Sequence, residues 1–303
     1  MRLNESNLHP PDQCHRYQTF VPLPFSHKRH FGIKLRQIRY KGLTNKPFLS
    51  SESLASMADV TILNEGQLTR VNLNRIRKMK SLFLNADFLE TFLEKFYEDL
   101  PEFVLFTGHS DRNFIAIPEL LAKVRKWYCQ NSSISDNQRI FTLPIGIENL
   151  SLGRAGRKQY FTNSKARHIN RVLVTPMSPT NPIRKKTVLE CMSMSNFDVF
   201  TQGLEERDYF AKMHDYQFNL CLEGNGYDTH RLWETLYLGR FPILLHSRWA
   251  ESLTYLNLPI MIVNSIAEIT EERLLAFWRK NEMFKPEEHS ALWCDFWRDL
   301  IES

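Results

Sequence analysis

The sequence predicts an α/β protein made of two doubly wound domains, each built on a parallel sheet. Three observations lead to this prediction: short apolar or β-branched runs recur along the chain, segments of helical period lie between many of them, and a polar stretch divides them into two series. Strands that alternate with helices form βαβ units and therefore a parallel sheet. A chain of 303 residues also exceeds the usual size of a single hydrophobic core, so two domains are expected.

The elements follow one another in a regular order along the chain. The first series of predicted strands comprises residues 59–63, 81–84, 103–106 and 140–145, with predicted helices over 86–100 and 117–130. The second series comprises residues 171–175, 198–200, 218–222, 241–245 and 259–263, with predicted helices over 184–194 and 229–239. Residues 149–168 are polar and lack a clear period, so we interpret them as the linker. We therefore expect an N-terminal domain over 1–160, a C-terminal domain over 161–303 and a cleft between them.

The composition is typical of a soluble globular protein, with 43% hydrophobic and 24% charged residues. No apolar run approaches the roughly 20 residues of a membrane-spanning helix, and the N-terminal sequence lacks the apolar core of a signal peptide. The five cysteines are scattered and form no CxxC pair, which favours reduced thiols and a cytoplasmic location. They are Cys14, Cys129, Cys191, Cys221 and Cys294.

Basic residues gather in two stretches. Residues 27–42 contain six Lys/Arg and no acidic residue, and residues 75–80 contain four more. These stretches fit either a solvated surface or an anionic partner, such as phosphate, anionic lipid or an acidic glycan. The second alternative predicts peripheral association with an anionic membrane surface at the inner membrane face. We expect no nucleic-acid partner, because the sequence has neither the pattern of an RNA-binding sheet nor a helix-turn-helix.

A glycine-containing turn marks the clearest candidate site. Two of the chain's 11 glycines, Gly224 and Gly226, lie in the segment 223–228, which directly follows the run 218–222, apolar apart from Asn219, and precedes a predicted helix that ends at Gly239. The turn thus lies between the carboxyl end of a strand and the amino end of a helix, where α/β sheets bind ligands and favour anions. Glycines at these two positions would let a phosphate or a sugar approach the main chain.

Polar residues follow the turn at helical spacing. Asp228 or Thr229 can cap the helix, while His230, Arg231 and Glu234 share one side of its first turns. The alternative is an ordinary surface ion pair, which contributes little to stability. The turn lacks the third glycine of a dinucleotide fingerprint and the Gly-Lys-Ser/Thr of a P-loop.

Residues 218–243 resemble the donor-binding segment of exostosin-like (GT47-type) glycosyltransferases of the GT-B fold, and they are similar to bacterial capsule and lipopolysaccharide glycosyltransferases. The matching residues are Phe218, Leu220, Gly224, Gly226, Thr229, Arg231, Glu234, Leu236, Gly239, Pro242 and Ile243. The resemblance implies two Rossmann-like domains that face each other across a cleft, with a nucleotide-sugar held mainly by the second domain. It also implies transfer of the sugar, with inversion, to a hydroxyl of a glycan or lipid-linked glycan acceptor.

The resemblance implies roles for individual residues. Glu234 would accept hydrogen bonds from the ribose hydroxyls, and Arg231 would pair with the diphosphate as it leaves. Arg184 and Lys185 open a helix after the strand 171–175, so they are either further phosphate ligands or surface charges. The predicted donor-binding residues are Arg184, Lys185, Glu223, Gly224, Asn225, Gly226, Asp228, Thr229, His230, Arg231 and Glu234.

We expect no metal and no cofactor. The sequence contains no Asp-x-Asp, no HExxH and no Cys/His cluster with zinc spacing. In GT-B enzymes, helix dipoles and basic side chains stabilise the leaving diphosphate in place of a metal ion.

An inverting transfer needs a general base, which we expect on the first domain near the carboxyl end of a strand. Asp111 and His109 follow the strand 103–106, with Arg112 beside them to tune either pKa, and Glu148 follows 140–145. The alternative role for the loop 108–114 is a helix cap. Other functions stay open: a nucleotide-sugar epimerase or a phosphorylase-like protein of the same fold, a non-catalytic sugar-nucleotide-binding protein, or a module that binds nucleic acid or a membrane surface through residues 27–42.

Overall fold

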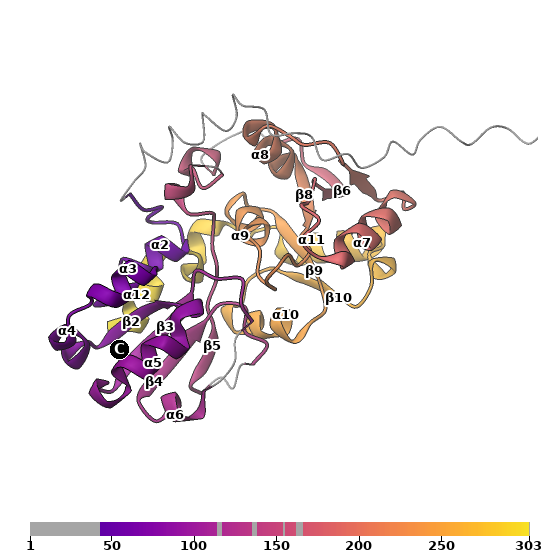
Figure 1. Cartoon of the computed structure of the whole chain (residues 1–303). Helices are drawn as coiled ribbons and strands as arrows, with labels where there is room; N and C mark the ends of the chain where they lie inside the picture. Colours follow the sequence, from indigo (N-terminus) through magenta and orange to yellow (C-terminus); the bar gives the residue numbers. More distant parts are fainter. Residues whose placement is uncertain (1–42, 114–116, 135–137, 154, 162–165, 303) are drawn as a thin grey trace, which may run out of the picture.

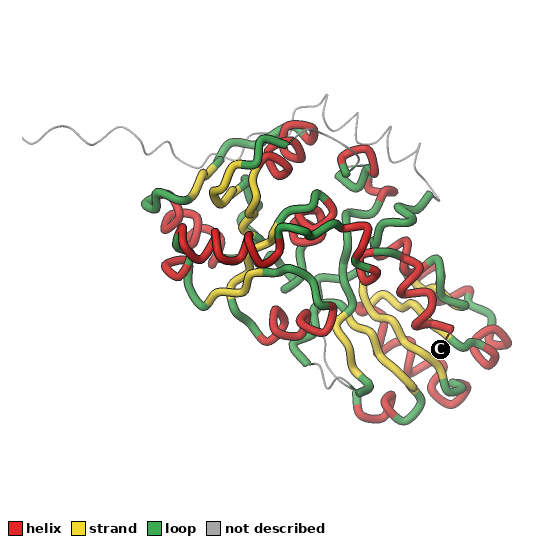
Figure 2. The backbone as a smooth tube through the Cα atoms, turned by 180° about the vertical axis from the view of Figure 1, so that it is seen from behind, coloured by secondary structure: helices red, strands yellow, loops and turns green. Residues whose placement is uncertain are grey.

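The computed structural model describes residues 43–113, 117–134, 138–153, 155–161 and 166–302, and it contains two sheets of five strands each (Figure 1). Every strand pair is parallel. The predicted fold class is therefore confirmed: two Rossmann-like α/β domains with parallel sheets, the architecture of the GT-B fold. Figure 2 shows the strands of the two sheets in separate parts of the molecule. The boundary after residue 160 stays a prediction, as does the basic segment 27–42, which lies outside the described residues.

The first sheet has the order β1-β2-β3-β4-β5, which follows the chain without a reversal. Its strands are β1 Val60–Ile62, β2 Ser81–Asn85, β3 Phe103–Gly108, β4 Val124–Cys129 and β5 Ile140–Thr142. One face packs against α3 Glu65–Arg70, α4 Leu73–Lys78, α5 Leu89–Phe96 and α6 Pro118–Leu121. Alternate residues of each strand point to opposite faces, so Leu105 packs among these helices while Phe106 faces away from them.

The segment 117–130 is not the single helix that we predicted. One helical turn, α6, is followed by the strand β4, which pairs with β3 and β5. Within β4, Trp127 and Cys129 pack on one face of the sheet and Tyr128 on the other. Burial of these side chains between two strands outweighs the helical period of the local sequence.

The second sheet has the order β10-β9-β8-β6-β7. Its strands are β6 Ile169–Val174, β7 Phe197–Val199, β8 Tyr216–Leu220, β9 Phe241–Leu245 and β10 Met261–Val263. The helices α7 Pro182–Met192 and α11 Glu271–Asn281 cover one face, and α8 Glu206–Asp215 covers the other together with α9 His230–Tyr237 and α10 Arg248–Ser252. This sheet is doubly wound, as predicted, whereas the first sheet is not, because its strand order does not reverse and α3, α4, α5 and α6 pack on one of its faces.

A continuous apolar core joins the two halves of the molecule. Phe83 and Phe106 of the first sheet belong to the same buried cluster as Trp233 of α9 and Trp249 of α10. The same cluster includes α2 Ser51–Ala55 and Trp297 of the C-terminal helix α12 Cys294–Glu302, which lies beside the first sheet in Figure 1. The chain therefore ends against its own first half. Among the described residues, no helix combines the length and the apolar character needed to cross a bilayer.

Candidate functional site

The candidate donor site lies where the strand order of the second sheet reverses. From β6 the chain moves outward to β7, and it then returns to place β8, β9 and β10 on the other side of β6. Parallel sheets bind ligands at such a switch point, outside the carboxyl ends of the two diverging strands. Here these ends carry residues 175–181 after β6 and residues 221–229 after β8. The second of these segments is the predicted glycine turn.

The helix α7 starts at this point for clear local reasons. Asn181 is its N-cap and accepts a hydrogen bond from the Ile183 N–H, and Pro182 occupies the first helical position. The Asn181 side chain also donates to the carbonyl oxygen of Gly224 over 3.2 Å. The cap of α7 thus ties the loop after β6 to the glycine turn after β8.

Arg184 of α7 fastens the two loops further. Its guanidinium donates to the carbonyl oxygens of Glu223, Leu222 and Ser178 and to the Thr180 hydroxyl, over 2.7 to 3.1 Å. One guanidinium nitrogen lies 2.8 Å from the position that a Cβ on Gly224 would take. The glycine therefore makes room for Arg184. Burial and the nearby charge of Arg231 lower the Arg184 pKa to about 10, so this arginine is still charged at neutral pH. The neighbouring Lys185 is exposed.

Arg231 and Glu234 lie on the first turns of α9, as predicted, but both are largely enclosed. Arg231 Nη2 donates to the Pro176 carbonyl oxygen over 3.0 Å, and its Nε has no partner among the described residues. Glu234 is 3% exposed, and its Oε2 accepts a hydrogen bond from the Tyr209 hydroxyl over 2.9 Å. Burial raises the Glu234 pKa to about 7, against the lowering effects of Tyr209 and Arg231.

The loops of the first domain meet the glycine turn through Asn131. This buried residue follows β4, and its Oδ1 accepts the Asp228 N–H over 2.9 Å while its Nδ2 donates to the Ser110 carbonyl oxygen over 3.1 Å. Its side chain lies 2.6 Å from the position of a Cβ on Gly226. The space beside both glycines of the turn is therefore filled by protein side chains.

The cap that we predicted for α9 is wrong. Thr229 occupies the N-cap position but makes no side-chain capping bond. The Asp228 carboxylate instead accepts the Ile145 N–H and the Trp233 Nε1–H, each over 2.8 Å. His230 contacts the same first-domain segment, since its Nδ1 lies 2.8 Å from the Gly146 carbonyl oxygen. Asp228 and His230 therefore hold the domains together, and this role competes with donor binding for their polar atoms.

Of the three predicted base candidates, Asp111 contacts the glycine turn. It is exposed, and its Oδ2 accepts a hydrogen bond from Asn225 Nδ2 over 3.1 Å. His109 is half-buried, burial lowers its pKa, and its Nδ1 lies 3.3 Å from Asn149 Nδ2. Glu148 is buried, and its Oε2 accepts the Ala155 N–H over 2.7 Å.

Two expectations for the loop 108–114 are wrong. Arg112 is not directed toward Asp111 or His109, whose pKa it was expected to tune. Its guanidinium instead forms a bidentate ion pair with Glu90 of α5. Asp111 does not cap the next helix either, since α6 has Ile117 at its N-cap position and no side-chain capping bond.

Sequence reasoning missed Tyr209 of α8 and Asn131, which contact the predicted site residues directly. Asn131 had a local signal, a polar residue after a buried strand, but the helix prediction over 117–130 hid that strand. No signal around Tyr209 indicates that its hydroxyl reaches a carboxylate on another helix.

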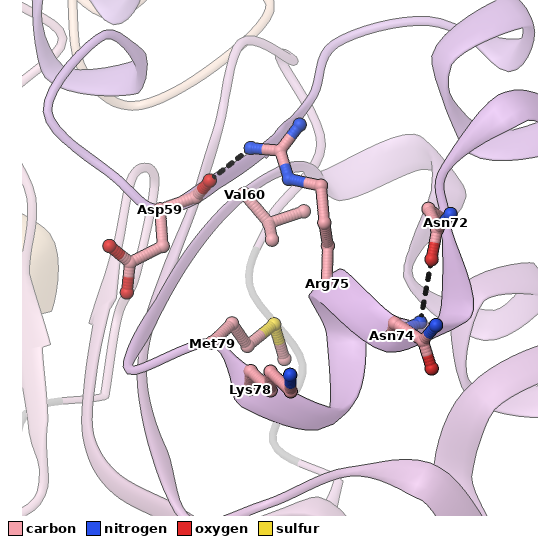
Figure 3. Close-up of a pocket in the computed structure, with 7 residues that line it drawn as sticks. All are labelled: Asp59, Val60, Asn72, Asn74, Arg75, Lys78 and Met79. Atoms are coloured by element: carbon pink, nitrogen blue, oxygen red, sulfur yellow. Dashed lines mark hydrogen bonds between the residues drawn. The ribbon is translucent and has the colours of Figure 1, made fainter.

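A surface hollow elsewhere on the first domain does not coincide with this site. It lies at the amino end of β1, whereas Asp111 follows the carboxyl end of β3 in the same sheet (Figure 3). Arg75 crosses the hollow and donates to the Asp59 carbonyl oxygen over 2.6 Å. The hollow is lined by Asp59, Val60, Asn72, Asn74, Arg75, Lys78 and Met79, so it includes part of the basic stretch 75–80.

Among the described residues, no three His, Cys, Asp or Glu side chains form a group that could hold a metal ion. The absence of a cofactor and of a metal requirement stays a prediction.

No protein-family model matches the chain, and no curated protein matches its sequence. Several solved structures are distantly similar to this chain, including these three. An α1,3-fucosyltransferase is 14% identical with a TM-score of 0.35, over 73% of this chain and 82% of that chain. A UDP-GlcNAc 2-epimerase from Neisseria meningitidis, bound to UDP-GlcNAc, is 12% identical with a TM-score of 0.32, over 88% and 84%. A UDP-N-acetylglucosamine 2-epimerase is 11% identical with a TM-score of 0.30, over 80% and 87%. Similarity at this level carries no argument about activity.

Proposed function

We propose that the protein is a glycosyltransferase that moves a sugar from a nucleotide-sugar donor to a hydroxyl of a glycan or lipid-linked glycan acceptor. The observation that carries this proposal is the convergence of Arg184, Arg231 and Glu234 at the switch point of the second sheet. We further propose that the transfer inverts the anomeric centre, needs no metal ion and serves surface polysaccharide biosynthesis. These finer statements follow the resemblance of residues 218–243 to exostosin-like transferases.

The chemistry of the three side chains fits the parts of a nucleotide-sugar. Burial and the nearby charge of Arg231 lower the pKa of Arg184, and two arginines this close together favour an anion between them. A diphosphate supplies that anion, and its departure as a leaving group is favoured by fixed positive charge. The Glu234 carboxylate suits hydroxyl donors such as those of a ribose.

The acceptor would approach from the first domain. Asp111 is exposed and contacts Asn225 of the glycine turn, so a base at this position would lie on the side of the turn that faces the first domain. We also propose that Lys185, Asp228, Thr229 and His230 contribute to donor binding, but less than the three residues above, because Lys185 is exposed and Asp228 and His230 bond to the first domain.

The proposal is tested by thermal-shift measurements with UDP, GDP, CMP and their sugars. A ligand at a hundred times its dissociation constant stabilises the native state by roughly 2.7 kcal/mol, so a donor should stand out. Product analysis follows with the donor alone and with acceptors. Conversion of the donor without acceptor would indicate an epimerase, and binding without turnover would indicate a non-catalytic binding protein. If no nucleotide raises the melting temperature, the proposed site is wrong.

A further inference from the structure

A buried polar cluster at the candidate site includes a residue from outside both site loops. Tyr209 lies on α8, and its hydroxyl donates to Glu234 Oε2 over 2.9 Å. Its ring lies beside Arg231, with the guanidinium carbon 5.9 Å from the ring centre. Tyr209 thus touches both charged residues that α9 contributes to the site.

The helix α8 holds Tyr209 in place through its neighbours. The adjacent Phe210 and Met213 are buried against the second sheet, and the rings of Tyr209 and Phe210 meet edge to face with their centres 5.0 Å apart. The position of the Tyr209 hydroxyl is therefore set by core packing, which is what a residue that orients another side chain requires.

The hydrogen bond from Tyr209 makes the two carboxylate oxygens of Glu234 different from each other. Within the described residues, Tyr209 is the one hydrogen-bond donor to this carboxylate, and it uses Oε2. Oε1 has no hydrogen bond there and keeps its full capacity to accept. A carboxylate fixed by one oxygen and open at the other can accept a pair of ligand hydroxyls without first losing rotamer freedom.

We propose that Tyr209 is a positioning residue of the donor site: its hydroxyl fixes Oε2 of Glu234, so that Oε1 accepts the vicinal hydroxyls of the nucleotide ribose. This inference rests on the proposed function, because it assigns the ligand of Glu234 as part of a nucleotide-sugar.

The pKa of Glu234 depends on the charged and titratable groups around it, so a change in this pKa can report on the hydrogen bond from Tyr209. These groups are Tyr209 on α8, Arg231 on α9, Cys221 after β8 and Glu148 on the first domain. Burial raises the Glu234 pKa to about 7, while Tyr209 and Arg231 lower it and Glu148 raises it. Burial and the Glu234 charge raise the Tyr209 pKa, so Tyr209 stays a neutral donor. Loss of its hydroxyl should therefore move the Glu234 titration to a higher pH.

The experiment compares Tyr209→Phe with a matched control, Tyr216→Phe. Tyr216 also donates to a carboxylate over 2.9 Å, that of Asp198, but at the amino end of β8, away from the switch point. The Glu234 side-chain carboxyl is titrated by NMR in ¹³C-glutamate-labelled protein, with Glu234→Gln to assign the signal. Donor affinity is measured from pH 6 to 9 for the nucleotide-sugar that stabilises the wild-type protein most.

In Tyr209→Phe, we expect the Glu234 titration to move up by about one pH unit or more. Donor affinity should then fall roughly fivefold at pH 7 from the lost ionisation alone, and a smaller loss should remain at pH 9, where the carboxylate is ionised again but no longer fixed. Tyr216→Phe should keep the wild-type profile of affinity against pH.

An unchanged Glu234 titration in Tyr209→Phe would overturn the proposal, and so would wild-type donor affinity at every pH. If the wild-type protein binds no nucleotide, the proposed function fails and the ribose assignment fails with it. The NMR titration still decides, in that case, whether Tyr209 controls the carboxyl of Glu234, so the two failures are distinguishable.

Discussion

The side-chain amide of Asn131 occupies the space that a side chain on Gly226 would need, with its Oδ1 2.6 Å from the position of the missing Cβ. Asn131 belongs to the first domain and Gly226 to the glycine turn of the second. The same amide accepts the Asp228 N–H and donates to the Ser110 carbonyl oxygen. One glycine of the turn is thus explained by a contact between the domains.

We therefore predict that Gly226→Ala destabilises the protein because its methyl group overlaps Asn131. The expected loss is about 1–3 kcal/mol, the usual cost of overpacking, measured by denaturant unfolding. Gly203→Ala is the matched control, since a Cβ at Gly203 has open space within 4 Å. The double variant Gly226→Ala/Asn131→Ala should lose less than the sum of the two single variants. Equal stability of the two single glycine variants would contradict this explanation.

A second prediction concerns the charged residues of α9. Arg231→Ala and Glu234→Ala should reduce transfer on the order of a hundredfold or more, since each removes an interaction with the donor. Turnover and donor affinity are measured beside Arg240→Ala, a buried arginine that donates to the His214 carbonyl oxygen near the amino end of β9. Near-normal turnover of either α9 variant would show that the donor site is misplaced.

The neighbouring residues of α9 should behave differently. Leu232 and Trp233 are fully buried in the core shared by the two halves. Leu232→Ala should therefore lower the free energy of unfolding by about 2–5 kcal/mol and affect turnover only through the folded fraction.

The third prediction is a pH dependence of stability caused by Glu234. Burial raises its pKa from an ordinary 4.5 to about 7, so between these values the folded state binds the proton more tightly than the unfolded state. The stability of the wild type relative to Glu234→Gln should therefore fall as the pH rises through this range, by up to about 1.4 kcal/mol per pH unit. Urea unfolding of both proteins at pH 5, 6, 7 and 8 measures this difference. A difference that stays constant with pH would contradict the raised pKa.

The fourth prediction concerns metal ions. Activity should survive dialysis against EDTA, because the proposed diphosphate ligands are the guanidinium groups of Arg184 and Arg231. Turnover is measured before and after chelation, with manganese and magnesium added back. Complete loss in EDTA and recovery with manganese would contradict the proposed metal-independent mechanism.

Much of the second domain could be predicted because its strands are buried on both faces. Residues 172–174 and 220–222 are continuous apolar runs, and Gly239 ends α9 with a positive φ of 68°. The strand β4 was missed because Arg125 and Lys126 interrupt its apolar pattern and a helical turn precedes it. Only pairing with β3 and β5 shows that it is a strand.

The site could be predicted as a location but not as a network of contacts. The glycine turn and α9 follow from local sequence, whereas Tyr209 meets Glu234 across 25 residues and Asn131 meets Asp228 across 97. Such partners depend on how α8 and the first domain pack against the turn. The predicted helix cap at Asp228 and the predicted effect of Arg112 on the pKa of Asp111 or His109 are wrong for the same reason, since each side chain bonds to a partner that lies far away in the sequence.

The last prediction identifies the general base. Asp111→Asn should keep donor affinity and lose turnover by about 10²–10⁴-fold, the usual contribution of a positioned base. Asp111 is favoured because it is exposed and contacts Asn225 of the glycine turn. Glu148→Gln should mainly lower the melting temperature, because its carboxylate accepts the Ala155 N–H. His109→Ala tests the third candidate, a half-buried imidazole beside Asn149 whose pKa is lowered by burial.

Asp87→Asn is the matched control for Asp111→Asn. Asp87 is also exposed and contacts the same loop, where its Oδ1 accepts the Ser110 hydroxyl over 2.6 Å, but it follows β2 and bonds to the loop rather than to the glycine turn. Donor affinity, melting temperature and turnover are measured for all four variants. Turnover of Asp111→Asn within about threefold of wild type would exclude Asp111 as the base. A large loss of turnover in His109→Ala or Glu148→Gln, with donor affinity and melting temperature retained, would assign the role to that residue instead.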